Sequence, residues 1–189
     1  MRITGGRARG IPLGVPKGDA VRPATDAMRQ AVFSSLAARV SGARFLDLFA
    51  GSGAYGLEAF SRGAAGGAFV EKDARTVACI RKNIAAVCTS LRCGTGDLRV
   101  INADATTVPA GAAPDIVFID PPYEIIPAIA PRLFTRLTES LAAIADPLIV
   151  FEMPGELSLA PEGWTCVKRL GKGAHQPTVC IFRTSRVLP

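Results

Sequence analysis

Histidine and cysteine, the side chains that bind most transition metals, are scarce in this sequence. Its 189 residues include one histidine and five cysteines, and no two cysteines form a C-x-x-C pair. A zinc site needs a cluster of such ligands, so the sequence predicts no metal. The odd number of cysteines also argues against a disulfide framework, which agrees with a reducing compartment.

Long apolar runs are missing as well. No stretch approaches the roughly 20 apolar residues that cross a bilayer, and residues 1–7 lack the apolar core of a signal peptide. We therefore expect a cytoplasmic protein. The composition, 49% apolar and 20% charged, is typical of a globular protein, and the length suits a single domain over residues 1–189. The sequence leaves the oligomeric state open, and a monomer is assumed.

Positive charge is concentrated near the N-terminus. Residues 1–44 carry eight basic and two acidic side chains, which accounts for the whole net charge of +6, and seven of the eight are arginines. Arginine forms bidentate contacts with phosphate and stacks on bases, so this segment favours a polyanionic partner over an ordinary charged surface. Gly, Pro and Arg enrichment in residues 1–20 predicts a basic, hairpin-like extension ahead of a core over residues 21–189.

The rest of the chain alternates between strand and helix patterns. Helices are expected over 26–39, 53–61, 74–87 and, interrupted by prolines, 125–144. Strands are expected over 44–49, 68–71, 100–102, 116–119 and 148–152, and an antiparallel pair over 165–170 and 179–184. Alternating strands and helices predict an α/β fold with a mostly parallel sheet covered on both faces.

The tetrapeptide Asp120-Pro121-Pro122-Tyr123 is the most informative motif. It follows the apolar run 116–119, which is typical of a buried strand, and the two prolines end that strand. Ligands of open parallel sheets bind beyond the carboxyl ends of the strands. A carboxylate and a backbone carbonyl can accept both protons of an exocyclic amine, while Tyr123 supplies a ring for stacking. The simpler alternative is a Pro-Pro turn with Tyr123 packed in the core.

A glycine-rich turn, Gly51-Ser52-Gly53, follows the first strand, and acids surround it. Asp47 lies within the first strand, Glu71 ends the second, and Asp104 follows the third. The glycines alone also fit a dinucleotide-binding turn. Acids on every side would repel a pyrophosphate, but they suit a cation that carries an amino acid, a ribose and an adenine. The pattern therefore favours S-adenosylmethionine.

These residues resemble the bacterial 16S rRNA guanine-N2 methyltransferase D family almost from end to end. The resemblance is carried by residues 2–7, 21–29, 45–53, 70–73 and 120–123. It implies a Rossmann-like class I S-adenosylmethionine-dependent methyltransferase, with a seven-stranded, mostly parallel sheet, an antiparallel last strand and a small N-terminal hairpin. It also implies methylation of N2 of one guanine, of the 16S rRNA (guanine(966)-N2) type. The choice of guanine rests on the resemblance and on no single residue.

The resemblance and the patterns together give a set of site residues. We expect catalysis by Asp120, Pro121, Pro122 and Tyr123, with the base turned out of its helix onto the tyrosine. We expect cofactor contacts from Arg22, Thr25, Asp47, Gly51, Gly53, Glu71, Lys72, Asp104 and Ala105. We expect 16S rRNA, within an assembling small ribosomal subunit, to contact Arg2, Arg7, Arg9, Arg22 and Arg29.

Three other functions fit part of the pattern. A DNA adenine-N6 methyltransferase could use the same tetrapeptide, but the chain has no separate target-recognition domain. An NAD-dependent oxidoreductase could use the glycine-rich turn, but Asp47 and the tetrapeptide argue against it. A non-catalytic RNA-binding domain on the same scaffold would have no need of an intact tetrapeptide.

Overall fold

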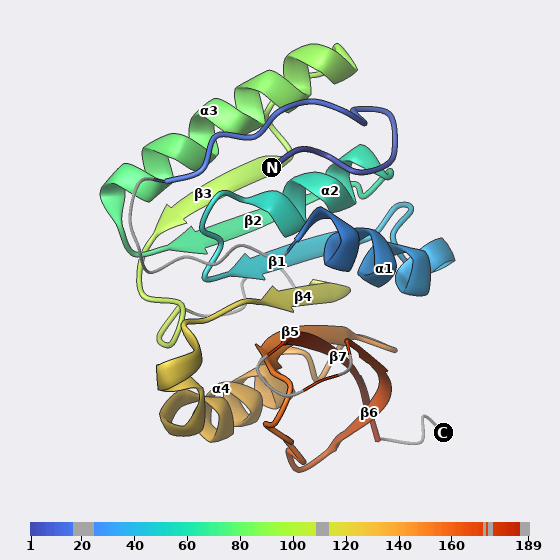
Figure 1. Ribbon diagram of the computed structural model, residues 1–189, viewed down its shortest axis with the longest axis vertical. Helices are drawn as coiled ribbons and strands as arrows, with labels where there is room; N and C mark the ends of the chain where they lie inside the picture. The colour runs from blue at the N-terminus through green and yellow to red at the C-terminus, as the bar shows by residue number, and fades with distance from the viewer. Residues whose placement is uncertain (17–24, 109–113, 172, 174–175, 186–189) are drawn as a thin grey trace.

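The computed structural model describes residues 1–16, 25–108, 114–171, 173 and 176–185. Seven strands form one sheet in the order β3-β2-β1-β4-β5-β7-β6 (Figure 1). The first five strands are parallel to one another, and β7 runs antiparallel to both of its neighbours. The strands are β1 Arg44–Leu48, β2 Gly66–Glu71, β3 Leu98–Asn102, β4 Ile116–Ile119, β5 Leu148–Pro154, β6 Trp164–Leu170 and β7 Pro177–Thr184.

Helices cover both faces of the sheet because side chains alternate along each strand. One apolar cluster joins Phe45, Phe69 and Phe118 to three helices on one face. A second cluster joins Leu46, Val117 and neighbouring strand residues to a single helix on the opposite face. The helices of the first face are α1 Asp26–Leu36, α2 Ala54–Ser61 and α3 Ala74–Leu91, and the helix of the second is α4 Ile126–Ser140.

The elements lie within a few residues of the ranges that the sequence predicts, and the differences have local causes. The helix α3 continues to Leu91 because Cys88 and Leu91 extend its buried face. The strand β2 begins at Gly66 rather than residue 68, since a Cβ on Gly67 would lie 2.2 Å from the Phe45 carbonyl oxygen. Glycine is what lets β2 start this close to β1.

Two helices on the first face begin at side-chain caps. Thr25 accepts a hydrogen bond from the Met28 backbone amide at the start of α1. Asp73 accepts one from the Thr76 amide at the start of α3. Such caps satisfy amides that have no partner within the helix, so they fix the residue at which each helix begins.

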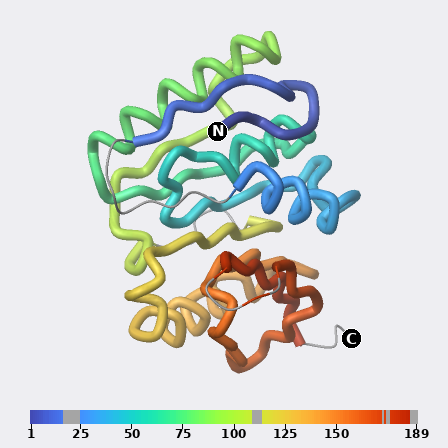
Figure 2. The backbone as a smooth tube through the Cα atoms, viewed as in Figure 1, coloured from blue at the N-terminus to red at the C-terminus, as the bar shows by residue number. Residues whose placement is uncertain are grey.

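The N-terminal residues form a hairpin that is packed against the domain. The Ile3 amide donates to the Ile11 carbonyl, the Ile3 carbonyl accepts from the Gly10 amide, and Ile3 is fully buried. The hairpin lies beside α2 and α3, at the other end of the molecule from β6 and β7 (Figure 2). It is therefore part of the core and not a loose tail.

Three buried polar side chains hold this hairpin in place. The Glu58 carboxylate accepts hydrogen bonds from the backbone amide and the hydroxyl of Thr4, at 2.7 and 2.8 Å. Ser61 accepts from the Ala8 amide, and Asn83 accepts from the Gly14 amide. Buried polar groups of this kind specify a position as well as stabilise it.

Candidate active site

Five acidic residues lie near the carboxyl ends of five neighbouring strands of the sheet. Along the order β3-β2-β1-β4-β5 they are Asp104, Glu71, Asp47, Asp120 and Glu152. Asp104 and Asp120 follow their strands, whereas the other three lie near the strand ends. Because parallel strands end at the same edge (Figure 1), residues far apart in the sequence share one side of the molecule. The row therefore brings five carboxyl groups to one edge of the sheet.

The glycine-rich turn joins β1 to α2 and is held by two of these acids. Glu71 accepts hydrogen bonds from the backbone amides of Gly51 (3.1 Å) and Asp73 (2.9 Å). Asp47 accepts one from the Gly56 amide in the first turn of α2, at 2.9 Å. Gly51 and Gly53 have φ angles of 54° and 76°, a region that favours glycine. The turn and both acids are thus brought together as predicted.

Asp47 is almost fully buried, and its surroundings change its proton affinity. Burial raises the pKa of its carboxyl group to about 8, the Glu71 carboxylate adds to the rise, and the Gly56 amide opposes it. A buried acid of this kind is neutralised either by a proton or by a nearby cation. Asp47 is therefore suited to face a positively charged ligand.

The other expected cofactor residues lie around the same edge with different exposure. Asp104 is exposed and accepts hydrogen bonds from the amide and hydroxyl of Thr106, which hold the pKa of its carboxyl group below the usual range. Ala105 is buried, Lys72 is exposed, and Thr25 caps α1. Arg22 lies outside the described residues.

The tetrapeptide leaves β4 at the centre of the row. The Asp120 backbone amide points to the Leu48 carbonyl of β1 at 3.5 Å. The Pro122 carbonyl accepts from the Ile125 amide as the chain turns into a short 3₁₀ helix at Tyr123–Ile125. Within the described part of the chain, no backbone amide donates to the Pro121 carbonyl. Asp120 and this carbonyl can therefore both serve as acceptors for a ligand.

Tyr123 is half-buried, with its hydroxyl 3.4 Å from the Glu152 carboxylate. Glu152 also accepts a hydrogen bond from the buried Tyr55 hydroxyl, at 2.9 Å. The sequence patterns did not single out Glu152 or Tyr55. The available signal was an acid at the end of the fifth predicted strand, in the same position that made Glu71 a candidate on the second.

Asp120 and Glu152 influence each other's protonation. Desolvation, the Glu152 carboxylate and then the Asp47 carboxylate raise the pKa of Asp120 well above its usual range, while Arg29 lowers it. Burial raises the pKa of Glu152, and the two tyrosine hydroxyls and Arg29 offset part of this rise. The site thus concentrates groups that take up protons more readily than ordinary carboxylates do.

The comparisons with known proteins agree with this geometry. The model of the family described as "Conserved hypothetical protein 95" matches residues 1–181. Ribosomal RNA small subunit methyltransferase D of Escherichia coli is 36% identical over 170 residues, which cover 87% of this chain and 81% of that protein. The Haemophilus influenzae protein of the same name is 32% identical over 178 residues, covering 92% and 89%.

A solved structure matches the fold over nearly its full length. "Putative methyltransferase yhhF" from Escherichia coli superimposes with a TM-score of 0.79 and 33% identity, covering 97% of both chains. The chain therefore belongs to the family described as "Conserved hypothetical protein 95". The resemblance noted from the sequence is confirmed, and so is the class I methyltransferase fold with its antiparallel last strand.

One expected RNA contact of this family member is wrong. Arg29 is fully buried in α1 and donates hydrogen bonds to the Arg2 carbonyl and to Asp26, each at 2.7 Å. It also lowers the pKa values of Asp120 and Glu152. Its periodic position on the helix faces the interior, so the positive charge of Arg29 acts on Asp120 and Glu152 and is not exposed at the protein surface.

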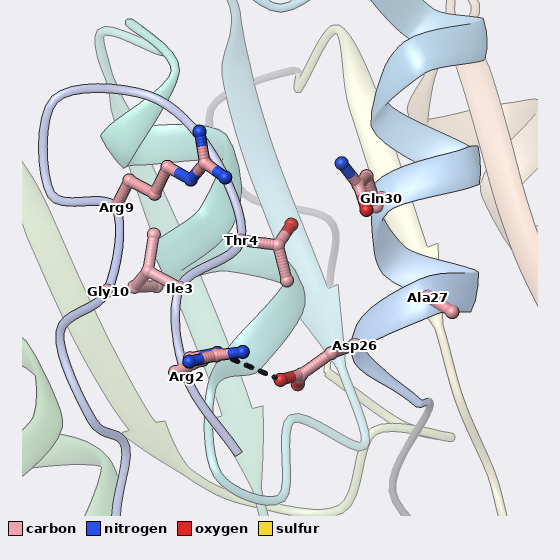
Figure 3. Close-up of a pocket in the computed structure, with 8 residues that line it drawn as sticks. All are labelled: Arg2, Ile3, Thr4, Arg9, Gly10, Asp26, Ala27 and Gln30. Carbon is pink, nitrogen blue, oxygen red and sulfur yellow. Dashed lines mark ion pairs between the residues drawn. The ribbon is translucent and has the colours of Figure 1, made fainter.

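Two of the exposed N-terminal arginines border a hollow between the hairpin and α1. Figure 3 shows Arg2 and Arg9 on the hairpin side and Asp26 and Gln30 on the helix side. The hollow has a volume of about 290 Å³. Asp26 forms ion pairs with Arg2 and with the buried Arg29. Because Asp26 is already neutralised, the net character of this surface is positive.

Metal-binding clusters and membrane-spanning helices are both missing from the part of the chain that the structure describes. Its residues contain no group of three or more His, Cys, Asp or Glu side chains arranged to hold a metal ion. None of its helices combines the length and the apolar character that crossing a bilayer requires.

Proposed function

We propose that this protein is an S-adenosylmethionine-dependent rRNA methyltransferase that methylates the exocyclic N2 amine of a guanine in small-subunit rRNA, of the 16S guanine-966 type. The observation that carries the proposal is that the tetrapeptide 120–123 leaves β4 next to the end of β1, the strand that leads into the acid-lined glycine turn. The names of the related proteins support rRNA of the small subunit as the substrate class.

The donor set fits S-adenosylmethionine, which supplies an electrophilic methyl group on a sulfonium ion when it is bound. Glu71 ends β2, the position from which an acid binds a ribose diol. Asp104, one strand further out, can accept from the adenine amino group. Asp47 lies beneath the glycine turn, where its negative form would neutralise the ligand's positive charge. Gly51 and Gly53 let the backbone approach the ligand closely.

The chain's part in the reaction is to orient a weak nucleophile. The N2 lone pair of guanine is delocalised into the ring. Asp120 and the Pro121 carbonyl accept hydrogen bonds from the amine and turn its lone pair toward the methyl group, so that positioning is the main catalytic effect. The same acceptors stabilise the positive charge that develops on nitrogen. Tyr123 stacks on the base after it leaves its helix.

The RNA backbone is proposed to follow the positive surface around the N-terminal hollow. Arg2, Arg7 and Arg9 are exposed, and the hairpin that carries them is fixed to α2 and α3. Arginine suits phosphate because it forms two parallel hydrogen bonds with it. Arg29 connects this surface to the catalytic acids through its bond to the Arg2 carbonyl. RNA bound here would lie close to the site.

Two alternatives are less well supported. A DNA adenine-N6 methyltransferase would use the same acceptors, but the related proteins are named for rRNA. An NAD-dependent oxidoreductase would need to place a pyrophosphate beside Asp47 and Glu71, where the Glu71 carboxylate would repel it and a buried Asp47 would offer it no positive charge. Binding of S-adenosylhomocysteine in preference to NAD would exclude the oxidoreductase in one titration.

The test is methyl transfer to small ribosomal subunits that lack the modification, followed by mapping of the labelled base. We expect label on N2 of a single guanine in 16S rRNA. Asp120→Ala should abolish turnover while the affinity for S-adenosylhomocysteine stays within a few-fold of wild type, because Asp120 contacts the amine and not the cofactor. Full activity of this variant, or label on another base, would contradict the proposal.

A further inference from the structure

Glu152 is a buried acid for which the mechanism above has no role. It is 2% exposed, and charged side chains are almost never fully buried without a partner. In the parallel register of β4 and β5, Ile119 is opposite Phe151. Asp120 and Glu152 each occupy the next position along their segments of the chain, so the two carboxylates lie side by side at the sheet edge. At this position the Glu152 carboxylate can affect the protonation of Asp120.

Two tyrosines connect Glu152 to the rest of the site. Tyr55 donates to one carboxylate oxygen at 2.9 Å, and its ring is stacked on Phe118 with 5.4 Å between ring centroids. Tyr123 lies with its hydroxyl 3.4 Å from the other oxygen. The buried Tyr55 therefore fixes Glu152, and Glu152 in turn restrains the ring that is proposed to stack on the target base.

We propose that Glu152 is a positioning residue for the methyl transfer, which fixes the Tyr123 ring and keeps Asp120 basic enough to accept a proton from N2. This inference rests on the proposed function and adds to it a defined proton acceptor. It also assigns a role to a residue outside the tetrapeptide.

The proton has to leave N2 during the reaction. A bond forms between N2 and the methyl carbon, the carbon–sulfur bond breaks, and its electron pair goes to sulfur. N2 then carries a positive charge and loses one proton, which the Asp120 carboxylate accepts. A carboxylate beside another negative group binds a proton more tightly, and a tighter proton acceptor is a better general base.

Several charged or titratable groups face Asp120 from the surrounding elements. Glu152 of β5 and Asp47 of β1 favour its protonated form, and Arg29 of α1 favours its ionised form. Tyr55 of α2 interacts electrostatically with Asp120 and also donates to Glu152, and the Tyr123 hydroxyl lies against Glu152. Among these neighbours Glu152 has the largest effect after desolvation. Removing the charge of Glu152 should therefore change the pKa of Asp120 more than substitution of any other of these neighbours.

The decisive variant is Glu152→Gln, which keeps the shape and removes the charge. Asp120 must be ionised to act, so kcat rises with pH through its pKa. In Glu152→Gln that rise should move to lower pH by about one unit or more, and the plateau at high pH should fall. Glu152→Asp keeps the charge and should leave the rise near its wild-type position. Exposed Glu162 gives the control, Glu162→Gln, which should match wild type.

A purely structural role for Glu152 predicts another result. Both Glu152 variants would then lose activity by the same factor at every pH, and the rise would stay in place. That outcome would overturn the proposal. The affinity for S-adenosylhomocysteine and the melting temperature identify variants that have lost their fold.

A second readout does not depend on activity. Carboxyl-carbon NMR of the free protein should show Asp120 titrating at a lower pH in Glu152→Gln than in wild type, and an unchanged titration would overturn the proposal. If wild type transfers no methyl group, the proposed function fails, while this titration still decides the interaction between the two acids.

The second half of the proposal is tested by Tyr123→Phe, which keeps the ring and removes the hydroxyl. We expect a several-fold rise in the KM for RNA with unchanged affinity for S-adenosylhomocysteine. An unchanged KM would show that the contact with Glu152 does not position the ring. If Glu152→Gln does not fold, the proposal is tested by the KM for RNA of Tyr123→Phe and the pH profile of Glu152→Asp.

Discussion

Asp47 shows how one residue can link stability to ligand charge. Its pKa rises from 3.8 to about 8 in the folded chain. Between these values the folded state holds a proton that the unfolded chain releases, so this residue's contribution to the free energy of unfolding decreases as pH rises. Asp47→Asn keeps an acceptor for the Gly56 amide but cannot ionise. We expect its melting temperature to fall less than that of wild type between about pH 5 and about pH 8.

Thermal melts of the ligand-free proteins measure this difference. Asp97→Asn, at an exposed carboxylate, is the matched control and should follow wild type. Asp120 and Glu152 also have raised pKa values, so the wild-type slope should be reduced and not abolished in Asp47→Asn. Parallel curves for wild type and Asp47→Asn would contradict the assignment.

At the scale of elements, the glycine turn depends on how closely α2 approaches the sheet. A Cβ on Gly56 would lie 2.4 Å from Phe69 and 2.5 Å from Phe45, and both rings are buried and packed against each other. Gly56→Ala should therefore displace α2 and lower the free energy of unfolding by about 1–3 kcal/mol, as overpacking of a core does. Denaturant unfolding measures this loss.

The same displacement should weaken cofactor binding, because the Gly56 amide is the hydrogen-bond donor to Asp47. Gly94→Ala is the matched control, since a Cβ at Gly94 would have no atom within 4 Å. That variant should be as stable as wild type and bind S-adenosylhomocysteine equally well. If the two variants had equal stability, close packing of α2 would not be what Gly56 provides.

At the scale of the whole molecule, Arg2, Arg7 and Arg9 are carried by a hairpin that is fixed to the domain. Ile3 is buried and Glu58 binds Thr4, so deleting the hairpin would damage the core as well as remove charge. A single substitution of an exposed arginine removes charge and leaves the buried contacts of the hairpin in place. Arg9→Ala should weaken RNA binding and reduce the slope of log affinity against log salt by about one, as loss of one phosphate contact does.

Binding to a small-subunit rRNA fragment over a series of salt concentrations provides the measurement. The control is Arg132→Ala, an exposed arginine of α4 on the opposite face of the sheet. It should keep the wild-type slope. Equal slopes for Arg9→Ala and Arg132→Ala would show that RNA does not follow the surface around the N-terminal hollow.

The sequence by itself determined the order of the elements and most of the acidic edge. Alternating apolar runs and helical periods place strands and helices within a few residues of where they lie. Acids at successive strand ends identify Asp47, Glu71, Asp104 and Asp120, because parallel strands that alternate with helices must end at one edge. These are consequences of local pattern and chain direction.

Only the tertiary structure decided which side chains face one another across that edge. Arginine is a residue type that is mostly exposed, yet α1 buries Arg29 beside the Arg2 carbonyl. In the sequence, Glu152 is an acid near a strand end like several others. In the structure, the pairing of β5 with β4 places it beside Asp120 and Tyr123. Burial and electrostatic coupling depend on distances through space, and the order of residues along the chain does not contain them.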